Sequence, residues 1–289
     1  MAKIGVVLSG CAGKGAYEIG CFQAIVEHFG KDNITCVSTA SVGSFIAQMY
    51  GMGKEDELKQ IFRDIDNGEY GRHMFGMSTN PKAVHTVQTI LADARRPDYE
   101  HYVSVWNVTH KRVEYVPFHA LNAEQLPQYM QAAISIPVFS KGIEVDGCVY
   151  LDGAMLDNIP VSPLLEKDLD YIFCVYFDNG RYVFETPEFD RKIIKLYDFP
   201  NQDRLASMFY KFGTYNQMYE YGYDYAGRVI EQLFKQTDPE SVYEAIFAYN
   251  DCANVNYKPR LTADVVVHNV NALAKRYSNG TFCRERHMK

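Results

Sequence analysis

The sequence lacks the features that mark several large classes of protein. No apolar run is long enough for a membrane-spanning helix, and the run at residues 4–8 is too short for a signal peptide. The seven cysteines are odd in number and form no C-x-x-C pair, so neither a disulfide framework nor a zinc knuckle is indicated. These absences predict a soluble, cytoplasmic protein without a metal site.

The chain also lacks a basic patch. Its 29 Lys and Arg residues are scattered among 36 Asp and Glu residues, and the formal net charge is -7. A protein that binds nucleic acid neutralises phosphates with clustered cations, so nucleic acid is excluded as a partner. Anionic membranes would repel the molecule on average, and any peripheral membrane contact must therefore depend on apolar groups. The sequence indicates no particular oligomeric state.

Low-complexity tracts, internal repeats and linkers rich in Gly, Ser or Pro are absent from the 289 residues. The 47% share of hydrophobic residues is typical of a globular protein with a large core. Beyond about residue 178, Tyr and Phe become frequent and the strand patterns fade. We therefore predict a single domain over residues 1–289, with a core over about 1–178 and a mainly helical, aromatic-rich extension over about 179–289.

Strand and helix patterns alternate along the core. Strands of apolar residues are predicted at 4–8, 35–40, 103–108, 113–118 and 171–177. Helical patterns are predicted at about 13–30, 42–52, 54–65, 83–94 and 123–134. This alternation implies an α/β fold, a three-layer sandwich with a mainly parallel central sheet and helices on both faces, to which the helical C-terminal extension is added.

Ser41 stands between a predicted strand and a predicted helix, in the segment T-A-S-V-G at residues 39–43. This is the setting of the nucleophile elbow G-x-S-x-G, where small flanking residues are needed because the strand and helix approach closely and the serine backbone is strained. Gly43 meets this requirement, whereas Thr39 does not obviously meet it. The segment equally suits a serine that caps the following helix, since Ser is a favoured N-cap residue.

A glycine-rich turn follows the first strand, with the sequence S-G-C-A-G-K-G-A-Y at residues 9–17. Its backbone N–H groups can converge at the N-terminal end of a helix, where they would hold the oxyanion of an acyl-transfer reaction, and Lys14 would add a cation at the loop's edge. A tight connection without a binding role is the alternative, while the nucleotide-binding patterns G-x-G-x-x-G and G-x-x-x-x-G-K-[ST] are not met. The candidate oxyanion-hole residues are Gly10, Cys11, Ala12, Gly13, Lys14 and Gly15.

A third segment carries a carboxylate. The apolar run at residues 149–151 ends in Asp152, and Gly153 is small enough to let another backbone come close. Asp-Gly is otherwise an ordinary turn signal, and by itself this pair of residues indicates no more than a turn.

Together the three segments resemble the patatin-like phospholipase family over about residues 4–165. The family's G-G-G-x-[RK]-G loop, G-x-S-x-G elbow and D-G-[GA] motif match residues 10–15, 39–43 and 152–154, and A-A-I-S-I-P-V-F at 132–139 is similar to the family's approach to the last motif. The resemblance implies a lipid acyl hydrolase without a cofactor, in which Ser41 is the nucleophile and Asp152 its base. It assigns supporting roles to Thr39, Gly43, Gly153 and Ala154.

The chain departs from the family pattern at Cys11 and Ala12, which replace loop glycines, and at Thr39, which replaces the first elbow glycine. If either loop residue needed a positive φ, the strain would cost about 1 kcal/mol or more and would misalign the oxyanion donors. Two alternatives therefore stay open. One is a catalytically weak or inactive patatin-like module that binds lipid or protein through its aromatic extension. The other is an α/β-hydrolase esterase whose triad adds His268 to the serine and the aspartate.

Overall fold

The computed structural model describes residues 2–70, 80–92, 96–137, 140–177, 191–197, 213–236 and 238–253. The strands are β1 (Ile4–Leu8), β2 (Ile34–Ala40), β3 (Glu100–Asn107), β4 (Arg112–Pro117), β5 (Ile143–Val145), β6 (Cys148–Asp152), β7 (Tyr171–Val175) and β8 (Ile193–Leu196). The α-helices are α1 (Gly15–Phe29), α2 (Val42–Gly51), α3 (Glu55–Asp66), α4 (Pro81–Ala92), α5 (Gln125–Ala133), α6 (Ser162–Leu165), α8 (Tyr215–Leu233) and α9 (Pro239–Ala253). Short 3-10 helices are η1 (Ala12–Lys14), η2 (Lys31–Asn33), η4 (Phe118–Ala120) and η5 (Gly153–Met155).

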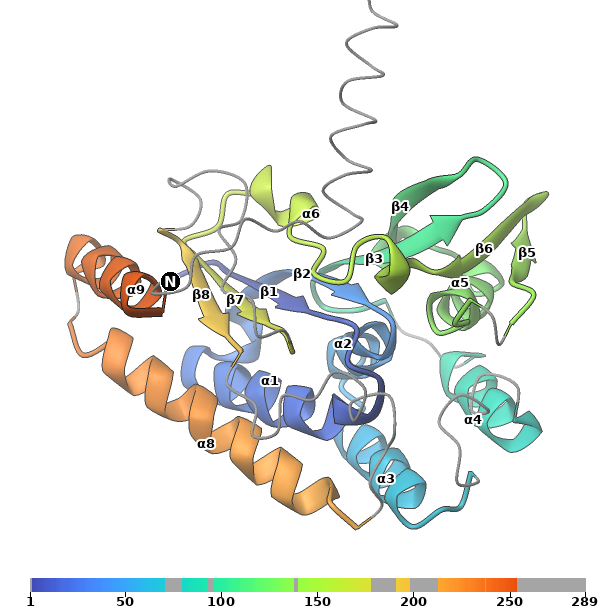
Figure 1. The fold of residues 1–289 in the computed structure, drawn as a ribbon, viewed down its shortest axis with the longest axis horizontal. Coiled ribbons are helices and arrows are strands. Elements are labelled where there is room, and N and C mark those ends of the chain that lie inside the picture. Colours follow the sequence, from blue (N-terminus) through green and yellow to red (C-terminus); the bar gives the residue numbers. More distant parts are fainter. Residues whose placement is uncertain are drawn as a thin grey trace, which may run out of the picture.

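A single sheet organises these elements (Figure 1). Its strands run in the order β5-β6-β3-β2-β1-β7-β8, and β4 pairs with β3 outside this path. The adjacent strands β3, β2, β1, β7 and β8 are mutually parallel. The pairs β3–β4, β3–β6 and β5–β6 are antiparallel and form one edge. The predicted mainly parallel central sheet is therefore confirmed.

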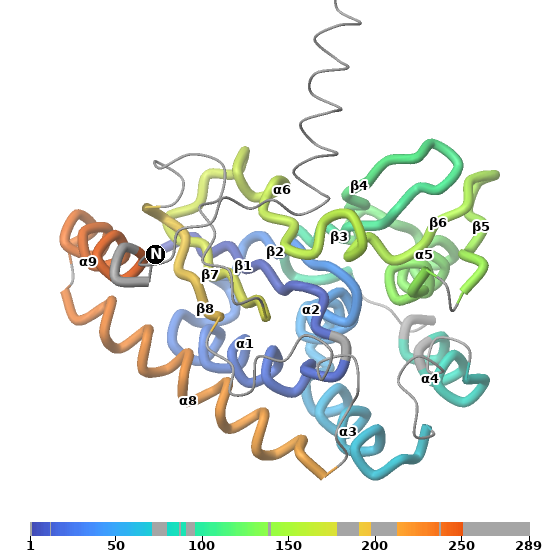
Figure 2. The backbone as a smooth tube through the Cα atoms, viewed as in Figure 1, coloured from blue at the N-terminus to red at the C-terminus, as the bar shows by residue number. Residues whose placement is uncertain are grey.

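The alternation of side chains in β1 divides the core between the two faces of the sheet. Val6 and Leu8 belong to the larger apolar cluster, while Val7 between them belongs to a smaller one. Helices α1 and α2 lie against the first face, with α8 alongside α1, and α6 lies on the other (Figure 2). Helices on both faces of a mainly parallel sheet confirm the predicted α/β fold class.

Helix α8 packs directly on α1 through one glycine from each helix. A Cβ atom at Gly20 would lie 2.1 Å from the carbonyl oxygen of Tyr219, and one at Gly222 would lie 2.3 Å from that of Tyr17. The Cys21 thiol also donates to the carbonyl of Gly222 at 3.3 Å. The two backbones thus touch at a distance that only glycine allows.

The described part of the predicted extension is helical apart from β8, which pairs in parallel with β7. The sheet therefore continues past residue 178. Along α8, the rings of Tyr215, Tyr219 and Tyr223 stack in a row, with centroids 6.1 and 6.3 Å apart. Because α8 and α9 contribute to the same apolar cluster as the strands, we retain the single domain as a proposal.

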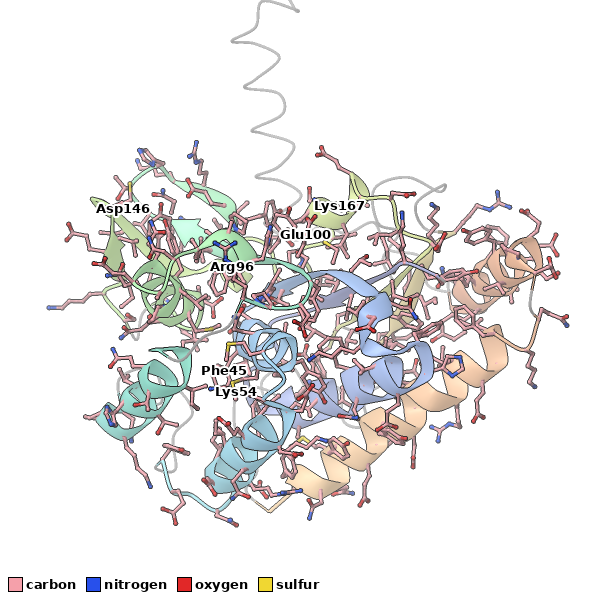
Figure 3. All side chains as sticks on the ribbon, turned by 180° about the vertical axis from the view of Figure 1, so that it is seen from behind. Phe45, Lys54, Arg96, Glu100, Asp146 and Lys167 are labelled. Atoms are coloured by element: carbon pink, nitrogen blue, oxygen red, sulfur yellow. The ribbon has the colours of Figure 1, made fainter. Side chains whose placement is uncertain are left out.

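The edge hairpin β5–β6 turns through Asp146 and Gly147, whose φ angles are 50° and 77°. Two successive positive φ values are characteristic of the tight turn that Asp-Gly favours between antiparallel strands. Asp146 lies at the periphery of the molecule (Figure 3). At another edge of the same picture, Lys167 forms an ion pair with Glu100 and so ties the segment after α6 to the start of β3.

Candidate active site

Ser41 occupies the turn between β2 and α2, with φ 52° and ψ -131°. This conformation costs a residue with a side chain about 1–3 kcal/mol, and it persists only where the surrounding packing enforces it. Although Ser41 stands at the N-cap position of α2, its side chain makes no capping hydrogen bond. The plain helix-cap interpretation therefore does not account for this serine.

The residues on either side of Ser41 fit the turn in different ways. A Cβ atom at Gly43 would lie 3.0 Å from the Cβ and the carbonyl oxygen of Leu8, so α2 and β1 approach closely because this residue is glycine. The hydroxyl of Thr39 lies 2.9 Å from Nε2 of His101 and 3.2 Å from Oγ of Ser44. The threonine that departs from the elbow pattern thus belongs to a buried polar network beneath the turn.

Asp152 ends β6, the strand that pairs with β3. The following Gly153 presses on β3, since a Cβ atom there would lie 2.4 Å from the carbonyl carbon of Ser104. The carboxylate of Asp152 accepts a hydrogen bond from the N–H of Ala154 at 2.9 Å, and the Ser41 side chain lies beside it. Asp152 is 2% exposed, and this burial raises its pKa to about 7, although the Ser41 side chain and the N–H of Ala154 both act to lower it.

The glycine-rich loop meets both of these groups. Gly10 donates its N–H to the carbonyl of Asn158, which lies in the loop after Asp152, at 3.2 Å. A Cβ atom on Gly10 would lie 2.3 Å from Oδ1 of Asn158, 2.9 Å from Cβ of Ala154 and 3.2 Å from Cβ of Ser41. The structure therefore brings the three sequence segments together, and it adds Asn158, which the sequence analysis did not single out.

The backbone of this loop has no positive φ at Cys11 or Ala12, the two residues that replace glycines of the family pattern. Cys11 has φ -116°, and within the described residues positive φ values outside glycine occur only at Ser41, Lys111 and Asp146. Two of the six predicted donors are engaged inside the protein, because Gly10 bonds Asn158 and Lys14 donates to the Cys11 carbonyl at 2.9 Å. The segment 11–13 lies between these two bonds.

Lys14, the cation expected at the edge of the loop, is buried. Its side chain is only 6% exposed, and its ammonium group lies 5.0 Å from the centroid of the Phe177 ring. The attraction between a cation and an aromatic face compensates for part of the hydration free energy that the cation loses on burial. Burial raises the pKa of the neighbouring Cys11 thiol well above its usual value, and the charge of Lys14 offsets this only in part.

His268, the histidine of the triad alternative, lies outside the described residues. His101, by contrast, is fully buried below the elbow, where its ring nitrogens lie 2.9 Å from Thr39 Oγ1 and 3.1 Å from Gln48 Oε1. Burial lowers the pKa of His101 to about 3, so its ring stays neutral near pH 7. We assign it to the support of the turn.

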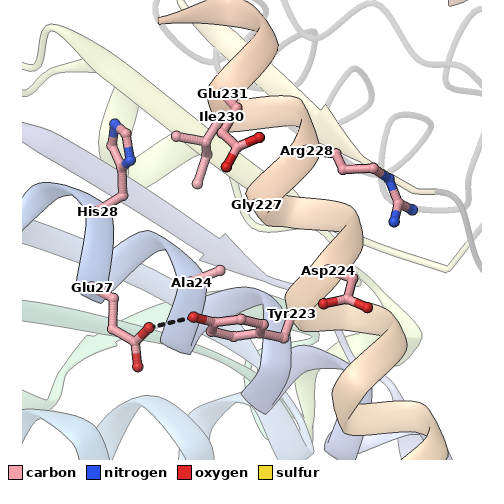
Figure 4. A pocket seen from close by; sticks show the side chains of 9 residues that line it. All are labelled: Ala24, Glu27, His28, Tyr223, Asp224, Gly227, Arg228, Ile230 and Glu231. Atoms are coloured by element: carbon pink, nitrogen blue, oxygen red, sulfur yellow. Dashed lines mark hydrogen bonds between the residues drawn. The ribbon is translucent and has the colours of Figure 1, made fainter.

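Away from these segments, a hollow of about 460 Å³ opens between α1 and α8 (Figure 4). It is lined by Ala24, Glu27, His28, Tyr223, Asp224, Gly227, Arg228, Ile230 and Glu231. The Tyr223 hydroxyl donates to Glu27 across it at 2.6 Å. Ser41 and Asp152 do not line this hollow, and so it is distinct from the site built around them.

Within the described ranges, no group of three His, Cys, Asp or Glu side chains has an arrangement that could hold a metal ion. No helix in the same ranges combines the length and the apolar composition needed to cross a membrane.

The sequence matches both a family model and individual curated proteins. A family model described as patatin-like phospholipase matches residues 6–165. Among curated proteins, lysophospholipase NTE1 of Yarrowia lipolytica is 28% identical over 187 residues, which is 60% of this chain and 12% of that protein. Lysophospholipase NTE1 of Saccharomyces cerevisiae is 26% identical over 187 residues, or 60% of this chain and 10% of that protein. The chain thus spans about a tenth of the length of these relatives.

Solved structures also match, at low sequence identity. VipD from Legionella pneumophila is 15% identical, with a TM-score of 0.47 and coverage of 96% of this chain and 77% of that one. The ExoU chain matched in the heterodimeric ExoU–SpcU complex of Pseudomonas aeruginosa is 14% identical, with a TM-score of 0.37 and coverage of 87% and 59%.

Proposed function

Because the chain belongs to the patatin-like phospholipase family, a family of lipid hydrolases, we propose that it cleaves carboxylic esters of lipids through a dyad of Ser41 and Asp152. The observation that carries this proposal is a single contact. The Ser41 side chain, held at a positive φ, lies beside the carboxylate of the buried Asp152, whose pKa it acts to lower. A serine activated by an adjacent base is the arrangement required of an acyl-transfer nucleophile.

In the proposed reaction, Asp152 takes the proton of Ser41 while Ser41 Oγ attacks the ester carbonyl carbon. The bond to the leaving alcohol breaks, Asp152 returns the proton to that alcohol, and the acyl group stays on Ser41. A water molecule then attacks the acyl carbon and gives a proton to Asp152. The bond to Oγ breaks, the proton passes to Ser41, and the fatty acid leaves. Every proton is returned, so no cofactor is needed.

The negative charge on the carbonyl oxygen requires donors that are already in place. We assign this role to the N–H groups of residues 11–13, which lead into η1 and α1, together with that of Val42, the residue after the nucleophile. The N-terminal end of the 15-residue α1 adds positive potential there. This assignment narrows the predicted loop of residues 10–15, since the N–H groups of Gly10 and Lys14 are engaged elsewhere.

Two further observations bear on the substrate. Met155, three residues after Asp152, is 58% exposed and is one of the large apolar side chains that reach solvent in the described chain. An apolar side chain beside the base suits a substrate with an acyl chain. The relatives named lysophospholipase support single-chain phospholipids as the first esters to test.

The alternative of an inactive module loses support, because Cys11 and Ala12 do not strain the loop.

Labelling with a fluorophosphonate probe tests the proposed nucleophile directly. We expect the wild-type protein to be modified, with the mass increase on the peptide that contains Ser41, because a phosphonate mimics the tetrahedral adduct of an activated serine. The matched control is Ser162→Ala, on α6, which should be labelled as fast as the wild type. Modification that maps to a different serine, or no modification at all, would count against the dyad.

The pH dependence of hydrolysis tests the proposed base. Asp152 can accept a proton only when its carboxylate is ionised. Because its pKa is about 7, about half of the molecules at pH 7 carry a protonated Asp152 that cannot act as a base. For a neutral ester we expect kcat/KM to fall by about tenfold per pH unit below 7 and to level off above it. Initial rates measured between pH 5 and 9 check this. A flat profile between pH 5 and 7 would contradict the assignment of Asp152.

A further inference from the structure

Four buried polar side chains from three elements meet beneath the turn that carries Ser41. Thr39 belongs to β2, Ser44 and Gln48 belong to α2, and His101 belongs to β3, and each is 0% exposed. The ring nitrogens of His101 lie 2.9 Å from Thr39 Oγ1 and 3.1 Å from Gln48 Oε1. Oγ of Ser44 lies 3.2 Å from Thr39 Oγ1. One imidazole ring thus contacts both the strand before the turn and the helix after it.

Stability alone does not require this polar cluster. A hydrogen bond in the interior adds little net stability, because the same groups would bond water in the unfolded chain, and apolar groups of the same shape can replace both partners at little cost. Within the described residues, Nε2 of Gln48 has no hydrogen-bond partner, a cost that an apolar side chain would avoid. A buried hydrogen-bonded network instead rigidifies the elements that it joins and specifies one arrangement of them.

The turn above the cluster is a place where such rigidity has a use. Ser41 has φ 52°, a conformation that persists only where the surrounding structure over-determines it. The first position of the elbow pattern is glycine in the family and Thr39 in this chain. The hydroxyl of this threonine is the group that contacts the ring of His101. The residue that departs from the pattern is therefore the one through which the strand side of the turn is held.

Strand β3, which carries His101, also lies between the strands that carry the nucleophile and the base. Ala40, the residue before Ser41, pairs with Ser104 of β3. The next residue of β3 pairs on its other side with Asp152. The spacing between Ser41 and Asp152 is therefore set across β3, and a contact that fixes the turn on β3 also fixes the nucleophile relative to the base.

We propose that His101 is a positioning residue for the nucleophile. Through Thr39 and Gln48 it holds both sides of the turn on β3, and it thereby keeps the serine side chain beside the carboxylate of Asp152. A misplacement of about 1 Å can lower a rate by about a hundredfold, so a contact beneath the turn is enough to control turnover. This inference rests on the proposed function, and it assigns a use to the threonine that replaces the elbow glycine.

The strand-side contact is tested by Thr39→Val, which removes the hydroxyl and keeps a β-branched side chain, against Thr39→Ser, which keeps the hydroxyl. On a lysophospholipid substrate we expect Thr39→Val to lower kcat by about 10- to 100-fold with KM within about twofold, and Thr39→Ser to retain kcat within about threefold. Fluorophosphonate labelling of Ser41 should slow in the valine variant by a similar factor. The matched control is Thr35→Val on the same strand, whose hydroxyl has no partner among the described residues, and it should retain wild-type kcat.

The helix-side contact and the ring itself provide independent variants. Gln48→Met removes the contact with α2 at similar length, and we expect about a tenfold loss of kcat. Combining it with Thr39→Val should add no further loss, because a ring that holds only one side no longer fixes the turn. His101→Phe keeps an aromatic ring, removes both contacts and should lose at least as much kcat as either variant. If it does not fold, Thr39→Val and Gln48→Met decide the question.

The outcomes separate this role from the proposed function. A wild-type kcat in folded Thr39→Val or Gln48→Met would overturn the positioning role and leave the dyad intact. So would equal losses in Thr39→Val and Thr39→Ser, or a loss of the same size in the Thr35→Val control. Absence of both hydrolysis and labelling in the wild-type protein would instead overturn the proposed function, and the role of His101 with it.

Discussion

Ser41→Ala is expected to lower kcat by at least about a thousandfold, because no other group in the proposed mechanism can carry the acyl intermediate. The thermal transition should stay close to that of the wild type. Alanine keeps the same Cβ atom and therefore the same backbone strain at φ 52°. Turnover of a lysophospholipid and a thermal melt, measured on the same preparation, check both expectations. Unchanged turnover would remove Ser41 from the mechanism.

Ser41→Gly is the informative companion. It should be as inactive as the alanine variant, but its folded state should be more stable by about 1 kcal/mol. Glycine adopts a positive φ without strain, which stabilises the folded state. The greater conformational entropy of glycine in the unfolded chain offsets only part of this stabilisation. Chemical denaturation of the two inactive variants measures the difference. If the glycine variant is less stable than the alanine variant, the positive φ of Ser41 is not the strained feature that we infer.

Asp152→Asn is expected to reduce kcat by a comparable factor of about a thousand or more, since a neutral amide does not accept the serine proton. Its size and its contact with the N–H of Ala154 can be retained, so the fold should persist. The matched control is Asp146→Asn, an exposed position at the turn of the neighbouring hairpin, where asparagine also tolerates a positive φ. The control should leave kcat unchanged, and an equal loss in both variants would point to a general effect of charge.

His268→Ala separates the dyad from a triad. In the dyad, Asp152 is the immediate base and the histidine variant should retain most of its activity. In a triad, the histidine would accept the proton, and its removal would cost about a thousandfold or more. A folded His268→Ala protein with activity reduced to that degree would refute the dyad, whatever the outcome for Asp152.

The elements of the sheet could be predicted because their signals are local. The apolar runs of β1, β2 and β7 and the periodicities of α1 to α3 lie within single segments of the chain. The hairpin β5–β6 was missed although its turn, Asp146-Gly147, carries a recognisable Asp-Gly signal. Its strands are short, and β5 has only three residues, so alternation along it is too brief to recognise.

Contacts between distant segments account for what the sequence did not reveal about the site. Asn158 meets Gly10 only because the loops after β1 and β6 come together in the fold. The burial of Lys14 likewise involves Phe177, a residue distant in sequence. Patterns within a segment identify reactive groups, but not the neighbours that hold them.

The contact of α1 with α8 has a consequence for the order in which the chain can fold. Cys21 and Gly222, which touch at this crossing, are 201 residues apart in sequence. Synthesis from the N-terminus at about 5–20 residues per second therefore leaves Gly20 and its side of α1 without their partner for about 10–40 seconds. During that interval α1 presents a groove shaped for another helix. A nascent chain that ends before α8 therefore leaves this side of α1 uncovered, and exposed surface of this kind favours aggregation.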